Sequence, residues 1–448
     1  MLLLASSFCF CLILLFLLIV KFHINSGIVL IGISLLLGIL NNVPIPQLLK
    51  AIYTGFLGQC FNMAPILIIG SLLGKILDIS GIASQISFTL TSKINRKHII
   101  YAIQLAAIMI GITMFFEVAF IIMLPMMYSL SQKIKLPLLN VAVPCVIGLS
   151  MTHSFLPPHP GPLLVCNLYG ANISSVLLWG IFIVLFISLS TKPLTYFLLG
   201  LIHTKTFPST QSTPISCPAT SIEYKNITLS PTLSIFCGML PIMGIIGMSS
   251  IGPLAFNSLP IHPSPNAFSA LGMLLSIGVI CCLLTMTERM MINGQLLRQL
   301  FGNSISSIWK ILFVICAGGT FKQVLSTIGF QSVLVEFIGY FDLSPIIVAW
   351  GSAAFLRFVL GSATVAVTAA AGITAGILSS YPIPLEIMAL ATTTGSIFAS
   401  HVNDPGFWVF KEYMHLSLPD AIKIRTTYTC ILSFMGLILV LLINRIFF

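Results

Sequence analysis

Apolar stretches of about 18 residues or more recur along the whole chain, and short polar segments separate them. A helix of that length crosses the hydrocarbon core of a bilayer, so the pattern predicts an all-α polytopic membrane protein. The first stretch, Met1–Val20, lacks the basic start and the small-residue cleavage site of a signal peptide. We therefore interpret it as the first spanning helix.

Composition agrees with this class of protein. Hydrophobic residues make up 57% of the chain and charged residues 7%, and the mean hydropathy is +1.09. The formal net charge is +10. Because most basic residues lie in the predicted loops, we interpret this charge as a signal of membrane orientation. Nucleic acid is therefore not expected as a partner.

A break rich in proline interrupts the apolar run from about 138 to 168. Pro157, Pro158, Pro160 and Pro162 remove backbone donors and clash with the preceding turn, so a regular helix cannot pass through. Irregular backbone is tolerated at membrane depth only where it is buried in protein or lines an aqueous cavity. A broken apolar helix that carries polar groups is typical of a transporter binding site. His153 and His159 lie in this break and are candidate substrate ligands.

The same order of features occurs twice along the chain. His153 follows Lys75 by 78 positions, and His401 follows Lys322 by 79 positions. In each half an interrupted apolar segment lies between the lysine and the histidine, and the histidine opens a break that ends in Pro-Gly. This pattern predicts an internal repeat, which is common in transporters. Each repeat is expected to hold five transmembrane helices plus one re-entrant hairpin, and the odd number of spans requires the second repeat to be inverted.

The predicted boundaries follow from these patterns. The first repeat covers residues 1–202, with a third helix at about Asn62–Leu77, a hairpin at about 99–131 and a broken helix at about 138–168. A polar linker rich in Ser, Thr and Pro covers 203–231. The inverted second repeat covers 232–448, with spans at about 232–248 and 267–285, a hairpin at about 344–378 and a broken helix at about 387–410. We expect the hairpin tips and the helix breaks to meet at the bilayer midplane.

The distribution of basic residues predicts the orientation. If both hairpins re-enter, most lysine and arginine residues, Arg425 among them, fall on one face, whereas the other face collects only Lys50 and Arg445. The positive-inside rule makes the richer face cytoplasmic. The linker is then cytoplasmic and both termini lie outside.

The tip of the second hairpin carries candidate substrate ligands. Arg357 lies four residues before Gly361, which opens the Gly-Ser-Ala-Thr sequence, and arginine suits the binding of a carboxylate. Gly361, Ser362 and Thr364 would leave backbone donors and hydroxyl groups open to a substrate. Two alternatives remain open: Arg357 pairs structurally with an acid such as Glu117, and the repeat lysines only cap carbonyls or extend toward water.

Several titratable groups are candidates for proton coupling. Glu117 lies among phenylalanines at the tip of the first hairpin, where burial would favour its uncharged form. Asp404 lies beside Asn403 in the second break, and His401 opens that break. Histidine titrates near neutral pH. The alternative interpretation is that each histidine only binds free backbone carbonyls in a bend.

Several motifs resemble the gluconate–proton symporter (gluconate permease) family, within the wider ion transporter superfamily. The matching motifs are Gly74-Lys-Ile-Leu, Phe115-Phe-Glu-Val118, Thr152-His, Pro157-Pro-His-Pro-Gly-Pro162, Ala317-Gly-Gly, Gly361-Ser-Ala-Thr-Val-Ala366, His401-Val-Asn-Asp404, Gly406-Phe-Trp408 and Lys411-Glu-Tyr413. The resemblance implies proton-coupled uptake of gluconate or a similar hydroxy acid, since some members carry idonate or D-serine. It also implies a homodimer in a bacterial inner membrane. Pro405 departs from the small polar residue that the family pattern has there.

The expected function is therefore secondary active import of a small hydroxy-carboxylate by proton symport through alternating access. Arg357 and open amides would hold the carboxylate, and Ser362, Thr364, the break histidines and Asn403 would bind hydroxyl groups. Glu117, or else Asp404 or a histidine, would carry the proton. The alternative is a sodium-coupled carboxylate or D-serine transporter of the same fold.

An intramembrane enzyme is not expected. His153, His159 and His401 together with Asp404 are residue types that bind metals. Their spacing, however, gives no i, i+4 ligand pair on a helix. We therefore expect neither a metal nor a cofactor. The sequence leaves the hydroxy acid unnamed, since gluconate, other aldonates, glycerate and D-serine present similar groups.

The predicted orientation is testable by labelling single cysteines from outside intact cells, in a background without the native cysteines. A probe in the linker at 203–231 should escape an impermeant reagent, and one at the C-terminus should react. The reverse pattern would rule out the inverted arrangement.

Overall fold

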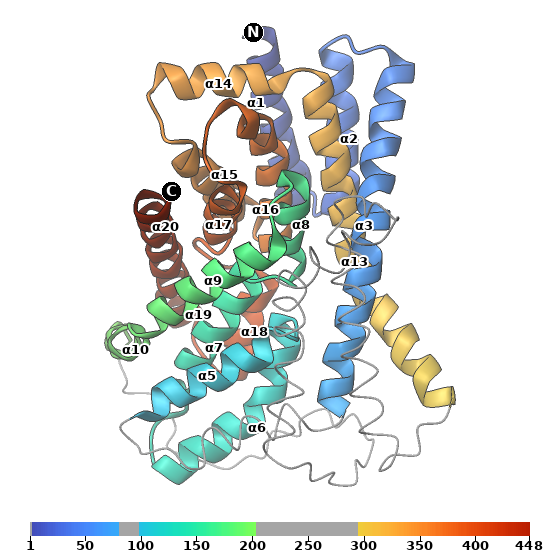
Figure 1. Ribbon diagram of the computed structural model, residues 1–448. Coiled ribbons are helices and arrows are strands. Elements are labelled where there is room, and N and C mark those ends of the chain that lie inside the picture. Colours follow the sequence, from blue (N-terminus) through green and yellow to red (C-terminus); the bar gives the residue numbers. More distant parts are fainter. Residues whose placement is uncertain (1, 80–97, 203–293) are drawn as a thin grey trace, which may run out of the picture.

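The structure, a computed structural model, describes residues 2–79, 98–202 and 294–448 (Figure 1). Every regular element in these residues is a helix, as the apolar pattern predicts. Four of the described helices are long and apolar enough to cross a membrane, or up to six if each sharply bent pair counts as one span. The chain is therefore a multi-pass membrane protein. The predicted linker and the predicted spans at 232–248 and 267–285 lie outside the described residues.

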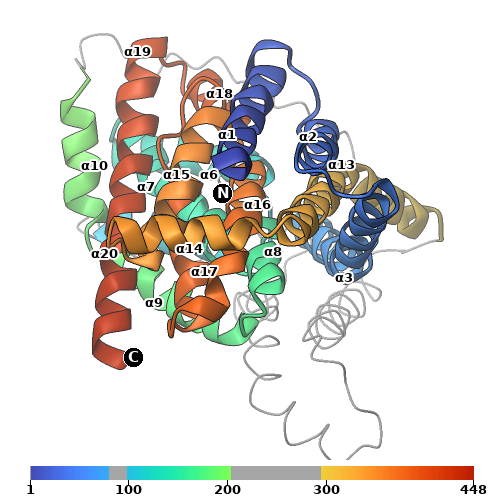
Figure 2. The same cartoon turned by 90° about the horizontal axis from the view of Figure 1, so that it is seen from above.

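The N-terminal helices run from the core to one side of the molecule, with the first of them nearest the core (Figure 2). They are α1 (Leu2–Phe16), which continues in a π-helical turn (Leu17–Lys21), α2 (Ser26–Leu40) and α3 (Ile45–Ile79). The expected start of the third helix at about Asn62 is wrong. The helix begins at Ile45 because Pro46 stands in its first turn, where the missing backbone donor has no intrahelical partner to lose.

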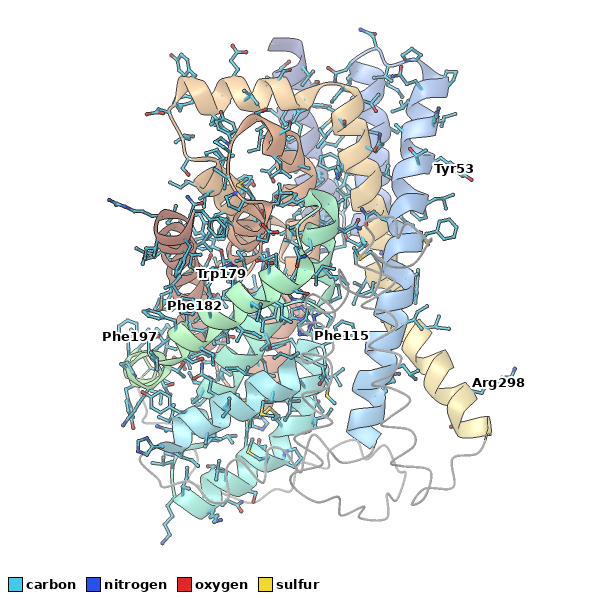
Figure 3. All side chains as sticks on the ribbon, in the orientation of Figure 1. Tyr53, Phe115, Trp179, Phe182, Phe197 and Arg298 are labelled. Carbon is cyan, nitrogen blue, oxygen red and sulfur yellow. The ribbon has the colours of Figure 1, made fainter. Side chains whose placement is uncertain are left out.

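A second long helix, α13 (Gly294–Thr327), runs antiparallel to α3 (Figures 1 and 2). The two backbones touch through glycines: a Cβ atom on Gly55 would lie 2.5 Å from the carbonyl oxygen of Gly319. Close by, the Thr320 hydroxyl donates to the Ile52 carbonyl at 3.3 Å. Small residues permit such close helix packing in membranes. Figure 3 shows Tyr53 of α3 and Arg298 of α13 pointing away from the rest of the protein.

Helix pairs occupy both predicted hairpin positions. The first pair is α5 (Ile99–Gly111) and α6 (Phe116–Ile134), and the second is α15 (Pro345–Leu360) and α16 (Ala363–Thr374), which a 3-10 turn (Ala375–Ser380) extends. Their interruptions fall where the sequence places the tips, just before Glu117 and just after Arg357. That both pairs re-enter the membrane stays a prediction.

Both predicted broken helices are interrupted in the structure. The first consists of α7 (Leu138–Phe155) and α8 (Pro160–Tyr169), and the second of α17 (Leu385–Gly395) and α18 (Pro405–Tyr413). A proline begins α8 and another begins α18, because the first turn of a helix does not need the backbone donor that proline lacks. This position accounts for Pro405, the departure from the family pattern. The α7 helix is buried along nearly its whole length and lies within the core.

The remaining helices cover this core. They are α9 (Ile173–Ser188), α10 (Thr191–Gly200), α14 (Phe330–Tyr340), α19 (Leu418–Ala421), a π-helical turn (Ile422–Thr426) and α20 (Thr427–Phe447). No helix was expected at the position of α14. Seen from above, α2, α3 and α13 lie at one side, and α7, α15, α16 and α17 lie together on the other (Figure 2).

The contact between α3 and α13 makes a prediction about stability. Gly55→Ala should push the two backbones apart and lower the free energy of unfolding by about 1–3 kcal/mol, the usual cost of overpacking. Gly58→Ala on the same helix is the control, since nothing lies within 4 Å of its Cβ position. Thermal unfolding of the purified protein in detergent measures both, and equal midpoints would contradict the close contact.

Candidate functional site

The tip of the second hairpin is built around a glycine. Gly361 ends α15 with a φ of +76°, a conformation that residues with a side chain rarely adopt. A Cβ atom there would also lie 2.2 Å from the backbone oxygen of Asn403. Beyond the turn, the Ser362 hydroxyl caps α16 by accepting from the Val365 amide at 3.4 Å. Arg357 in the last turn of α15 and Thr364 in the first turn of α16 therefore flank a fixed, sharp turn.

Asn403 ties the second break to this tip. Its side-chain nitrogen donates to the carbonyls of Phe358 at 2.9 Å and Val359 at 3.3 Å. These carbonyls belong to the last turn of α15, where intrahelical donors run out. The side-chain oxygen of Asn403 is buried and has no hydrogen-bond partner within the described chain.

His159 ties the first break to the first hairpin in the same way. Its Nε2 atom lies 2.6 Å from the carbonyl oxygen of Gly111, the last residue of α5. The ring of His159 meets that of His153 edge to face, with 5.0 Å between the centroids. His153 Nδ1 is buried without a hydrogen-bond partner among the described residues. The interpretation that a break histidine serves a backbone carbonyl therefore holds for His159, whereas His153 keeps a nitrogen free.

Each hairpin also touches the broken helix of the opposite half. A Cβ atom on Gly161 of α8 would lie 3.2 Å from Val367 of α16, and one on Gly406 of α18 would lie 3.2 Å from the ring of Phe116 of α6. Glycine follows proline at both places. These paired contacts are what an inverted repeat would produce, and the repeat itself stays a prediction.

A buried ion pair lies where the second hairpin meets the second break. Arg357 is 4% exposed, and its Nη2 atom lies 2.7 Å from Oδ2 of Asp404. The other oxygen of Asp404 caps α18 by accepting from the Gly406 amide at 3.1 Å. Among the described residues the carboxylate partner of Arg357 is thus Asp404. The alternative that Arg357 pairs with an acid is confirmed in this form, with Asp404 in place of Glu117 as the partner.

Arg357 keeps two nitrogens without protein partners. Its Nε and Nη1 atoms are buried and have no hydrogen-bond acceptor in the described part of the chain. A buried donor without an acceptor is costly, and more so on a charged group. These two donors are therefore available to a further anion or polar group.

Arg425 belongs to the same cluster and is buried, whereas charge counting placed it among the exposed residues of a cytoplasmic loop. The residue is 4% exposed, and its Nη2 atom lies 3.5 Å from Oδ2 of Asp404. The π-helical turn that holds Arg425 directs it inward, whereas the side chain of Lys423 in the same turn is 50% exposed. The signal in the sequence was its position directly before the last apolar stretch, where a charge is costly.

Glu117 lies in the first turn of α6, half-buried, at the tip of the first hairpin. The preceding residue, Phe116, lies against α18 at Gly406, which brings the tip that carries Glu117 close to the start of that helix.

The remaining candidates take backbone partners. His401 Nδ1 lies 2.9 Å from the Ala399 carbonyl, and its ring stacks on Phe358 at 4.9 Å. Lys322 donates to the Leu168 carbonyl at the end of α8, which favours the capping interpretation for this lysine. No group of three or more His, Cys, Asp or Glu side chains in the described ranges is arranged as metal ligands would be.

Comparison with known proteins identifies the family. The profile described as GntP family permease matches residues 1–446. The chain belongs to the GntP permease family. The resemblance found from the motifs is thereby confirmed.

The relatives of this GntP family permease are transporters. The chain is 33% identical over 447 residues to the high-affinity gluconate transporter of Escherichia coli strain K12, covering 97% of this chain and 98% of the relative. It is 34% identical over 443 residues to the gluconate permease of Bacillus subtilis strain 168, covering 96% of each. The Alcanivorax borkumensis YdaH transporter shares the fold, with a TM-score of 0.62 at 13% identity over 88% of both chains.

The buried ion pair gives a prediction for this GntP family permease. Asp404→Asn keeps the volume but leaves buried guanidinium charge uncompensated, so the free energy of unfolding should fall by about 3–5 kcal/mol. Glu412→Gln is the control because it breaks an exposed pair with Lys411, which contributes at most about 1 kcal/mol. Denaturation in detergent compares the two, and equal loss in both variants would contradict the role of the buried pair.

Proposed function

We propose that this GntP family permease imports gluconate, or a related small hydroxy-carboxylate, by proton symport through alternating access. The observation that carries the proposal is the pair of unpartnered nitrogens on buried Arg357. The names of the relatives, a gluconate transporter and a gluconate permease, support gluconate as the substrate. We further propose that the protein works as a homodimer in a bacterial inner membrane.

The charge of the cluster suits a monoanion. Arg357 and Arg425 bring two positive charges, and Asp404 brings one negative charge within hydrogen-bond or ion-pair distance of both. One substrate carboxylate would neutralise the remaining positive charge. Because burial strengthens electrostatic attraction, this site would bind an anion more firmly than an exposed arginine would.

Polar groups around Arg357 would bind the hydroxyl groups of the substrate. Asn403 supplies an unpartnered oxygen and His153 an unpartnered nitrogen, both buried. Ser362 and Thr364 stand at the N-terminal end of α16, where backbone amides and the helix dipole favour anions. Gly361, His159 and His401 would act by holding the shape of the tips and breaks.

Glu117 is the proposed proton carrier. It lies at the tip of the first hairpin, directly after Phe116, which meets the start of α18 beside Asp404. With Glu117 protonated, the site keeps a net positive charge that attracts the substrate anion. With Glu117 charged, the attraction weakens and release is favoured. One proton per monoanion makes this cycle electroneutral.

Uptake into proteoliposomes tests the proposed function. We expect accumulation of gluconate when the lumen is alkaline, competition by other aldonates, and no requirement for sodium. Accumulation that follows a sodium gradient, or that occurs with D-serine but not gluconate, would instead favour the alternative transporter.

Arg357→Lys keeps the charge but loses the planar guanidinium that holds Asp404 and a second acceptor together. We expect gluconate binding to weaken by about 1–3 kcal/mol, measured by calorimetry on purified protein. Arg298→Lys is the control, since Arg298 is exposed and points away from the site (Figure 3). Unchanged affinity in Arg357→Lys would mean that backbone amides alone hold the carboxylate.

Glu117→Gln imitates a permanently protonated carrier. Exchange of gluconate across the membrane should persist, while accumulation driven by a pH gradient should vanish because the variant has no proton to release. Exposed Glu412→Gln should behave like the parent. If Glu117→Gln still accumulates substrate with the parental pH profile, then Asp404 or one of the break histidines carries the proton instead.

A further inference from the structure

Arg425 contacts side chains from three separate parts of the chain. Its Nε atom donates to Ser400 in the second break at 3.2 Å, and its Nη1 atom donates to Ser150 of α7 at 3.4 Å and to Tyr428 of α20. Ser400 in turn donates to Asp404, and Ser150 and Tyr428 lie 3.0 Å apart. These hydroxyl groups form a continuous buried network between α7, the second break and α20.

The guanidinium of Arg425 also covers the tip of the first hairpin. Its Cζ atom lies 4.4 Å from the centroid of the Phe116 ring, a cation–π contact, and Phe116 directly precedes Glu117. The absence of a side chain on Gly406 leaves room for this contact, since a Cβ atom there would lie 2.9 Å from Nη2 of Arg425. Arg425 thus links the tip that carries Glu117 to the break that carries Asp404.

The two buried arginines differ in how their nitrogens are used. Each nitrogen of Arg425 has a protein partner, as the contacts with Ser400, Ser150, Tyr428 and Asp404 describe. Arg357 has Nε and Nη1 without partners in the described chain. Arg357 therefore has donors available to a ligand, whereas the donors of Arg425 all bind other parts of the protein.

We infer that Arg425 is a positioning residue that holds the anion site and the tip of the first hairpin in a fixed relation. By binding Asp404 directly and through Ser400, it fixes the carboxylate that orients Arg357. By covering Phe116, it fixes the backbone that carries Glu117. Loss of Arg425 would therefore loosen two places that are far apart in the sequence, one in each half of the chain.

Hydrogen–deuterium exchange on the purified full-length protein tests this link without reference to a substrate. Arg425→Gln and Arg425→Lys should raise deuterium uptake in both 112–118 and 400–406. Arg357→Gln should raise it in 400–406 alone, and Lys423→Gln, which removes an exposed charge from the same turn, should change neither segment. If both Arg425 variants leave 112–118 at the parental level, the inference fails.

Phe116→Leu tests the same contact even if the arginine variants misfold. It removes the aromatic ring that Arg425 covers and leaves every charge in place. It should raise uptake in 112–118 and leave 400–406 near the parental level. Parental uptake in 112–118 in this variant would also overturn the link, since the contact with Arg425 would then not hold that tip.

A transport measurement distinguishes a positioning role of Arg425 from a general loss of stability. This measurement rests on the proposed function. For gluconate exchange, Arg425→Lys should raise KM by about tenfold or more, which corresponds to about 1.4 kcal/mol of binding free energy, because Asp404 and Arg357 are no longer held in place. The maximal rate per folded protein should change little. Lys423→Gln should keep the parental KM. A parental KM in Arg425→Lys would contradict the inference. If the parent protein does not carry gluconate, only the proposed function is contradicted, because hydrogen–deuterium exchange is measured without substrate.

Discussion

The ion pair between Arg357 and Asp404 is the constraint on which the site depends. A buried charge is costly without a partner, and in this chain the partners come from the end of α15 and the start of α18. Their pairing brings the tip of the second hairpin against the second break. Arg425 shares the same carboxylate and links it to the first hairpin. One acid between two guanidinium groups thus joins elements from both halves of the chain, while two nitrogens of Arg357 stay without a partner in the described residues.

The interrupted helices are possible because side chains replace the lost backbone hydrogen bonds. Asn403 serves the last carbonyls of α15, and His159 serves the end of α5. Lys322 does the same for α8, and Asp404 caps α18. These polar residues account for irregular backbone inside an apolar protein, and they surround the proposed binding site.

Much of this arrangement was predictable, because prolines and charges in apolar stretches are costly and therefore informative. That rule located both breaks and the interruptions of both helix pairs beside Glu117 and Arg357. It did not predict that Arg357 pairs with Asp404 rather than Glu117, since the pairing depends on how separate elements pack. It also misplaced Arg425, because charge counting treats a residue at the edge of an apolar stretch as part of a loop. In the structure Arg425 lies in the π-helical turn before α20 and its side chain is buried.

The most direct test of the account is an experimental structure with gluconate bound. We predict that the substrate carboxylate lies about 2.7–3.2 Å from Nε or Nη1 of Arg357, while Asp404 stays on Nη2. Gluconate bound away from Arg357, with those two nitrogens still unpartnered, would contradict it.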